Sequence, residues 1–308
     1  LYIAMAFLPI PAFLVMIFYV IMYALNMSTV PMLTMIAMNY INEGTYVNFG
    51  LARGIGSASW ATSALIFGQV VSFLGANILS IAYCVFALVT LFILYHLPES
   101  KITKTKTEGV QEEGSVVTVI KKYKIFFFLL LGFCFMFSGA TAIGTYLINI
   151  VKSLGGNTSL YGVAMFAMAF SELPVMMTVP KLMKKFNSVT LILVASIFYI
   201  CRNYTIGLAP NLIVLIIGMM FQGLSYGLFT GVITYYVTYN LDTQDQMSGQ
   251  TMIGIMTSGI GSTLGNVLGG ILQDTIGLNA LFTFVYLMTA LGAVIIFICK
   301  FVSVKVKK

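Results

Sequence analysis

The sequence predicts an all-α protein, a polytopic bundle of transmembrane helices. Hydrophobic residues make up 59% of the 308 positions and charged residues only 8%, whereas a soluble domain carries about 25% charge. Apolar stretches close to 20 residues recur along the chain, and about 20 helical residues cross the roughly 30 Å hydrocarbon core of a bilayer. Such segments must be helical, because in lipid a helix satisfies its own backbone N–H and C=O groups.

Nine full spans are expected from these apolar stretches. A shorter apolar stub at Leu1–Leu8 precedes the break at Pro9–Pro11. The predicted spans lie near 12–38, 52–73, 78–97, 125–149, 159–179, 188–208, 211–238, 250–273 and 279–303.

The basic residues predict the orientation of these spans. All but three of the 16 Lys and Arg residues fall in the 98–124 segment, in Lys181–Lys185 and in the tail from Lys300. Threading nine spans places these three segments on one side of the membrane and Lys152 on the other. The positive-inside rule then predicts a cytoplasmic 98–124 segment and C-terminus. The expected partner of the net charge of +7 is the lipid bilayer, not nucleic acid, and a bacterial plasma membrane is the expected location.

The 98–124 segment also divides the chain. It is long, polar and of mixed charge, which favours a mostly flexible cytoplasmic linker. Six spans follow it and three precede it, whereas many transporters have two six-helix halves. Because the chain starts at Leu1, we expect a 6+6 fold without its first two to three helices. Residues 1–97 would form a partial bundle (the end of helix 3 and helices 4–6), and 125–308 would form helices 7–12 with a basic tail.

Residues suited to enzymatic or metal chemistry are few. The four cysteines, Cys84, Cys134, Cys201 and Cys299, lie within spans and show no CxxC spacing. His96 is the one histidine, so a metal site or a Ser-His-Asp triad is not expected. We therefore expect no enzymatic activity and no cofactor.

Three ionisable residues lie inside apolar stretches: Arg53, Glu172 and Arg202. A charge at the centre of a membrane helix costs about 2.5–3.5 kcal/mol on insertion scales, so it usually faces a cavity or a partner. A functional site is the favoured interpretation. The alternative is a structural ion pair that fixes helix packing.

The segment around Arg53 has a pattern suited to sugars. On a helix, Arg53, Gly56, Ser57 and Trp60 share one face. A guanidinium donates paired hydrogen bonds to hydroxyls, and an indole ring can stack on the apolar face of a pyranose. Trp60 is the one tryptophan of the chain, and from spacing alone packing or interfacial anchoring explains it equally well.

A family resemblance adds to this pattern. The stretch Asn48–Trp60 (NFGLARGIGSASW) resembles the fifth-helix signature of the lactose permease family of oligosaccharide/proton symporters, within the major facilitator superfamily. That family has FGxAR, a Gly, a small residue and then Trp at the same spacing. The resemblance implies that Arg53 binds sugar hydroxyls and that Trp60 stacks on the sugar ring. Ser171-Glu172-Leu173 is similar to the eighth-helix Gly-Glu-Leu, whose carboxylate contacts sugar, and Arg202 matches the ninth-helix arginine.

The sequence also departs from that family. Met35 stands where the family has a sugar-binding glutamate, and Gln222, Ser225 and Ser258 replace the histidine, glutamate and lysine of its later helices. These departures leave open the galactoside preference and the proton relay. Another cation, passive transport, or proton coupling through Glu172 alone are the alternatives.

We therefore expect a secondary transporter, a monomer that moves a sugar by cation (proton) symport. The expected substrate-binding residues are Arg53, Trp60, Glu172 and Gln222, and Glu172 with Arg202 would couple the ion. Gln222 and Tyr226, four residues apart, would form a polar, aromatic cavity wall. The alternatives are a facilitator for another small organic solute (an aromatic acid, nucleoside or drug) and a non-transporting membrane sensor or assembly protein.

Overall fold

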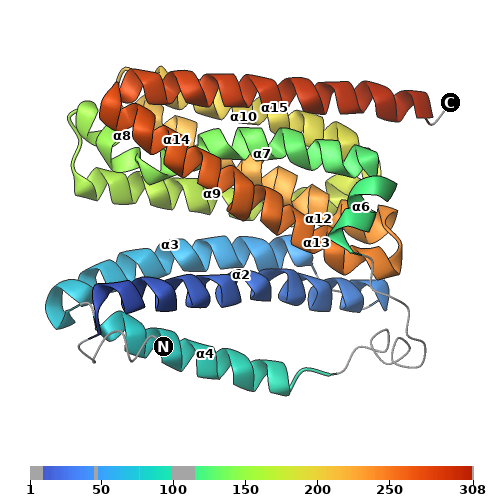
Figure 1. Ribbon diagram of the computed structural model, residues 1–308, viewed down its shortest axis with the longest axis horizontal. Coiled ribbons are helices and arrows are strands. Elements are labelled where there is room, and N and C mark those ends of the chain that lie inside the picture. Colours follow the sequence, from blue (N-terminus) through green and yellow to red (C-terminus); the bar gives the residue numbers. More distant parts are fainter. Residues whose placement is uncertain (1–9, 45–47, 76, 99–114, 307–308) are drawn as a thin grey trace. The chain divides into compact units, whose positions relative to one another are not determined.

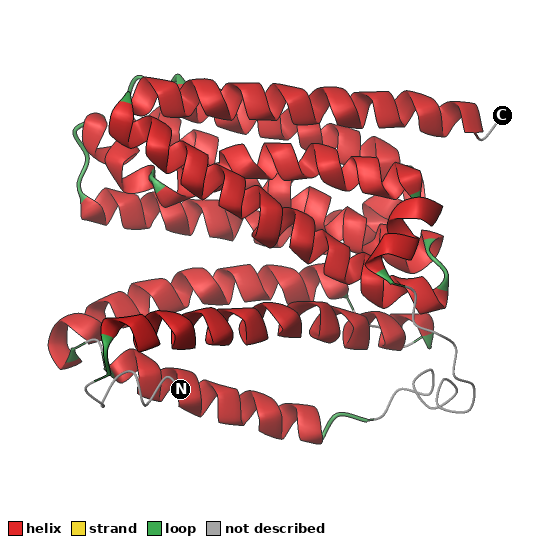
Figure 2. Ribbon diagram, in the orientation of Figure 1, coloured by secondary structure: helices red, strands yellow, loops and turns green. Residues whose placement is uncertain are grey.

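The computed structural model describes residues 10–44, 48–75, 77–98 and 115–306. Every regular element in these ranges is helical (Figure 2). The stub expected at Leu1–Leu8 and residues 99–114 of the polar segment lie outside the described residues. The predicted all-α class is confirmed.

Eight described helical segments are long and apolar enough to cross a membrane. They match eight of the predicted spans. The remaining span, predicted at 52–73, lies in the continuous helix α3 (Phe49–Leu74). The eight segments are Ala12–Asn42, Ile78–Tyr95, Lys124–Thr145, Leu160–Lys185, Ser188–Gly207, Leu212–Asn240, Thr243–Thr275 and Leu278–Val302.

The chain divides into two units. The first contains α2 (Ala12–Asn42), α4 (Ile78–Tyr95) and the part of α3 that begins at Thr62. Within it, the side-chain amide of Asn26 donates to the Tyr83 hydroxyl at 3.3 Å, which joins α2 to α4. The second unit contains the start of α3, residues 48–61, and all described residues from Ser115 onward.

The second unit is a bundle whose helices pack in a few close pairs (Figure 1). Helix α7 packs on α14 and α15, α10 packs on α11 and α15, and α9 packs on α11 and η1. The elements are α6 (Val116–Lys122), α7 (Lys124–Thr145), α8 (Leu147–Ser153), α9 (Thr158–Lys185), α10 (Ser188–Gly207), α11 (Leu212–Met220), η1 (Gly223–Gly227), α12 (Leu228–Asn240), η2 (Thr243–Asp245), α13 (Gln246–Gly254), η3 (Ile255–Gly261), α14 (Ser262–Thr275) and α15 (Leu278–Val306).

Glycines allow the closest of these approaches. A Cβ at Gly132 of α7 would lie 2.8 Å from Cγ1 of Ile296, and a Cβ at Gly292 of α15 would overlap the Gly132 carbonyl. Small residues at such crossings let membrane helices pack by van der Waals contact, since lipid supplies no hydrophobic force between helices. Further along α7 and α15 lies an apolar, fully buried core, which includes Ile143 and Leu281.

Asparagines begin three of the helices in the second unit. The side chains of Asn157, Asn187 and Asn211 accept backbone N–H groups from the first turns of α9, α10 and α11 at 2.9–3.0 Å. Each cap satisfies a donor that the helix itself leaves unpaired. These caps mark the first residues of α9, α10 and α11.

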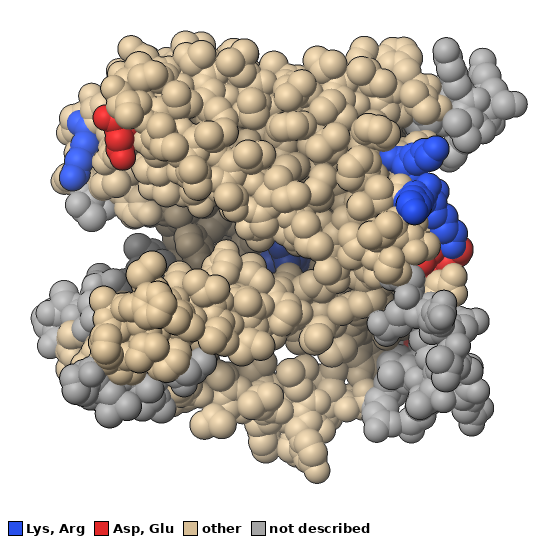
Figure 3. All heavy atoms as spheres, in the orientation of Figure 1, with Lys and Arg blue, Asp and Glu red and all other residues tan. Residues whose placement is uncertain are grey.

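The structure differs from the predicted spans in two respects. Segments η1 and η3 are π-helical and interrupt the spans predicted at 211–238 and 250–273. Helix α9 runs to Lys185, so the basic residues Lys181–Lys185, expected in a loop, lie in its last turns. On the face drawn in Figure 3, the charged side chains of the second unit lie mainly at its ends.

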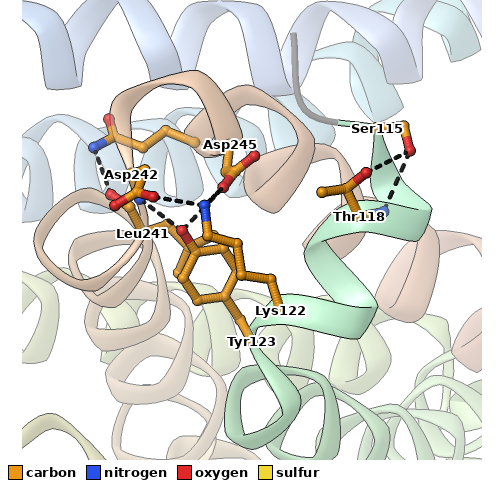
Figure 4. Close-up of polar contacts among 8 residues, drawn as sticks. Ser115, Thr118, Lys122, Tyr123, Leu241, Asp242 and Asp245 are labelled. Atoms are coloured by element: carbon orange, nitrogen blue, oxygen red, sulfur yellow. Dashed lines mark hydrogen bonds and ion pairs between the residues drawn. The ribbon is translucent and has the colours of Figure 1, made fainter. Parts of the chain in front are cut away.

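One end of the second unit carries a polar cluster (Figure 4). The last part of the segment expected to be a flexible linker forms α6, and its final residue, Lys122, places its ammonium 2.6 Å from Asp242 Oδ2 and 2.8 Å from Asp245 Oδ2. The Tyr123 hydroxyl donates to Asp245 Oδ2 and accepts the N–H of Asp242, both at 2.9 Å. We call Lys122, Tyr123, Asp242 and Asp245 the clamp, because they join α6 to the connection between α12 and α13.

The clamp changes the electrostatics of its members. Hydrogen bonds to Asp242 and Asp245 raise the pKa of Lys122, and the bond from Lys122 lowers the pKa of Asp242. The Asp245 side chain is 1% exposed, although it lies between the spans predicted at 211–238 and 250–273. An ammonium and a phenol both bond to Oδ2 of its carboxylate and offset the cost of burial, while its Oδ1 has no partner among the described residues.

Candidate functional site

The first turns of α3 pack on α9 through small residues. A Cβ at Gly50 would overlap the carbonyl of Met176, and a Cβ at Gly54 would lie 2.8 Å from Cδ1 of Leu173. Positions 50, 54 and 57 share one helix face because they are spaced by four and three residues. As α3 advances from Gly50 to Gly54, its contact on α9 moves back by one turn. The next residue on that face, Ser57, bonds to Glu172, the neighbour of Leu173.

Glu172 is the centre of the site. Its side chain is buried, with the residue 5% exposed. Ser57 donates its hydroxyl to Oε2, and the Gln222 amide donates to Oε1 at 3.3 Å. The guanidinium groups of Arg53 and Arg202 lie within electrostatic range of the carboxylate. Of the predicted site residues, the structure thus bonds Gln222 directly to the buried acid, whereas Arg53 and Arg202 contact Tyr226 and Asn203.

The π-helical segment η1 positions Gln222. Its Gly223 N–H donates to the Ser171 Oγ at 3.0 Å, and a Cβ there would overlap the Ser171 carbonyl. A Cβ at Gly227 would lie 3.6 Å from Cα and Cβ of Glu172. Two glycines thus hold η1 against the turn of α9 that carries the acid. Single π-helical turns inside helices are frequent at functional sites.

Arg202 is held by neighbours on its own side of the site. It is 1% exposed, its Nη1 donates to Asn203 Oδ1 at 2.9 Å, and the Asn203 amide donates to Thr289 Oγ1 at 2.7 Å. Among the described residues, its Nε, the Tyr199 hydroxyl and the Gln222 Oε1 have no hydrogen-bond partner. Buried polar atoms are nearly always hydrogen-bonded, so these three mark where water or a polar ligand group fits.

The family is shown by a match between this chain and a protein-family model. The model of the MFS_1 like family matches residues 2–284. The protein belongs to this family of the major facilitator superfamily. It is accordingly a multi-pass membrane protein of a transporter family, not an enzyme family, as the sequence predicted.

Two sugar permeases are among the proteins that this MFS_1-like chain resembles. The maltose permease of Geobacillus stearothermophilus is 22% identical over 277 residues, which is 90% of this chain and 69% of the permease. The crystal structure of the E. coli fucose:proton symporter FucP matches with a TM-score of 0.56 at 16% identity, and a second FucP structure in the outward conformation with 0.53 at 15%. This likeness shows the fold, over 75% of this chain; the chain spans 58% and 57% of the two FucP chains.

Not every predicted residue of this MFS_1-like chain joins the site. Trp60 is 54% exposed, and in the described part of the chain no hydrogen bond or ring contact joins it to Arg53 or Glu172. Arg53 is half-buried and its Nη2 lies 3.4 Å from the Tyr226 hydroxyl. The described residues contain no group of three His, Cys, Asp or Glu side chains arranged to hold a metal ion.

The bond between Ser57 and Glu172 was not predicted from the sequence, although Ser57 was expected on the same helix face as Arg53. The signal was present, because Gly50, Gly54 and Ser57 form a stripe of small residues at helical spacing. Such a stripe predicts a close helix crossing, and a hydroxyl at its end faces whatever the partner helix presents.

Proposed function

We propose that this protein is a secondary active transporter that moves a sugar or oligosaccharide in symport with a cation, most simply a proton. The observation that carries the proposal is the buried Glu172 carboxylate, bonded by Ser57 and Gln222 and near two arginines. Buried ionisable residues in membrane helices mark substrate and proton pathways. The functions printed in the names of the two relatives, a maltose permease and a fucose:proton symporter, support this choice.

The substrate side of the proposal uses four residues. Arg53 offers a planar set of donors to sugar hydroxyls, while Glu172 accepts from them and Gln222 has a free carbonyl oxygen for one more. Trp60 supplies an aromatic face. The resemblance of Asn48–Trp60 to the lactose permease signature supports the assignment of Arg53 and Trp60.

The coupling side uses Glu172 and Arg202. Arg202 is buried, lies within electrostatic range of the acid and donates to Asn203. A cation near the carboxylate stabilises its ionised form, and loss of water stabilises its protonated form. A change in the distance or hydration of the pair during the transport cycle would therefore bind or release a proton. The positive-inside rule supports a cytoplasmic position for the polar 98–124 segment and the C-terminus.

The test is sugar uptake by the full-length protein in the presence and absence of a protonophore. We expect wild type to accumulate at least one sugar of a panel against its gradient, and the protonophore to abolish accumulation. Glu172→Gln keeps the side-chain shape and removes the titration. It should lose uphill accumulation while part of the sugar exchange survives.

The matched control is Asp274→Asn, which removes an exposed carboxylate at the end of α14 and should leave accumulation unchanged. Normal accumulation by Glu172→Gln would show that Glu172 does not couple the ion. Another coupling residue or a sodium site would then take its place.

A second candidate is transport of another small organic solute on the same scaffold. It is favoured by Met35 and Ser258, which replace two polar family residues with an apolar and a neutral side chain. Uptake of an aromatic acid or a nucleoside, with no uptake of any sugar, would decide for it.

A further inference from the structure

An aromatic group of α7 and η1 lies directly beside the candidate site. The Tyr226 ring centroid is 5.6 Å from that of Phe137 and 6.4 Å from that of Phe133, with interplanar angles of 31° and 25°. The three rings are thus roughly parallel. Tyr226 and Phe137 are half-buried, whereas Phe133 is 1% exposed.

Phe133 is fixed by its other neighbours. It stacks on Phe229 of α12 with an interplanar angle of 4° and receives the edge of Tyr199 at a centroid distance of 5.4 Å. An edge-to-face pair such as Phe133–Tyr199 is worth about 0.5–1.5 kcal/mol beyond its area. The group therefore holds the plane of the Tyr226 ring in one orientation.

The polar end of Tyr226 reaches the substrate residues. Its hydroxyl accepts from Arg53 Nη2 at 3.4 Å, which is longer than the usual 2.7–3.2 Å. The contact is weak, so a ligand hydroxyl can replace it on the guanidinium at little cost. Tyr226 also lies four residues after Gln222, whose amide bonds Glu172. One side chain thus combines a fixed ring with a replaceable contact to Arg53.

We infer that Tyr226 is a substrate-contacting residue whose ring stacks on the apolar face of a pyranose bound by Arg53 and Glu172. This inference rests on the proposed sugar transport and adds a specificity determinant to it. The C–H face of a pyranose matches an aromatic ring, and its hydroxyl rim matches the adjacent guanidinium and carboxylate. Trp60 is 54% exposed and has no ring contact to Arg53 in the described residues. Trp60 is then not the sole aromatic residue that contacts the sugar.

The experiment measures equilibrium binding to the purified full-length protein, with maltose, fucose and the acyclic alditol fucitol as probes. Tyr226→Phe keeps the ring and should weaken fucose binding about threefold or less. Tyr226→Leu removes the ring and should weaken fucose binding at least tenfold but fucitol binding less than threefold, because fucitol has no ring face to stack. Tyr226→Met, close to tyrosine in length, should behave as Tyr226→Leu does.

The matched control is Tyr204→Leu. Tyr204 stacks on Tyr286 in the same unit, with a centroid distance of 4.4 Å, so its loss tests for general damage to aromatic packing. It should change sugar binding less than twofold. If wild type binds sugar and Tyr226→Leu or Tyr226→Met binds it within twofold as well, this inference alone is overturned. An equal loss of fucose and fucitol binding would also overturn this inference alone. No sugar binding by wild type overturns the proposed function and this inference with it.

Discussion

The hydrogen bond from the Asn203 amide to Thr289 Oγ1 joins α10 to α15 inside the second unit. Both residues are 0% exposed, and the donor–acceptor distance is 2.7 Å. Thr289→Val keeps the side-chain shape and leaves the amide without its acceptor. An unsatisfied buried donor costs about 1–3 kcal/mol in soluble proteins, but interhelical hydrogen bonds in membrane proteins average about 0.6 and reach about 1.7 kcal/mol. Because the amide is fully buried, we expect about 1–1.7 kcal/mol, a roughly five- to twentyfold fall in the folded-to-unfolded ratio.

The assay is reversible denaturant unfolding of the purified protein in one fixed detergent. Thr289 also donates to the Val285 carbonyl of its own helix, so the control must lose an equivalent bond. Thr283→Val does so, because exposed Thr283 donates to the Asn279 carbonyl on the same helix. Thr289→Ser should restore most of the loss. Equal free energies of unfolding for Thr289→Val and Thr283→Val would refute the reasoning.

Two further predictions concern packing and pH. Gly50→Ala should lower thermal stability in detergent, because its Cβ would overlap the Met176 carbonyl. The control Gly56→Ala should be neutral, because no atom lies within 4 Å of its Cβ. Equal melting temperatures of the two variants would contradict this prediction. The lowered pKa of Asp242 means that its bond to Lys122 stabilises the fold above the ordinary aspartate pKa and is lost as pH falls through the lowered value. Asp242→Asn should therefore lose less stability than wild type on acidification, measured by thermal unfolding across pH 3–7. Parallel curves of melting temperature against pH would show that the Asp242–Lys122 bond does not contribute to the pH dependence of stability.

The spans could be predicted because the bilayer imposes one length and one polarity on every crossing. The helix ends were less predictable. Helix α2 runs to Asn42 and α9 to Lys185, beyond the predicted 38 and 179. A helix can extend past the apolar region into polar residues, so hydropathy alone underestimates its length.

The candidate site was predictable as a set of residue types and not as a set of contacts. The cost of burying charge indicates Arg53, Glu172 and Arg202 from the sequence alone. The bonds of Glu172 to Ser57 and Gln222 depend on where α3 and η1 cross α9, which a single sequence does not specify. Asp245 illustrates the same limit, because its burial depends on Lys122 and Tyr123 more than 100 positions earlier in the chain.

The π-helical segments η1 and η3 change the direction in which the side chains of the following helices α12 and α14 face. A π-helical turn includes one residue more than an α-helical turn, which corresponds to about 100° of rotation on an α-helix. Residues after Gly227 and Gly261 therefore face directions that a helical wheel drawn for one uninterrupted α-helix assigns to other positions. Deleting one residue within either segment would therefore restore a regular helix and leave the following side chains facing their present neighbours, whereas deleting one residue from a regular α-helix would rotate them by about 100°.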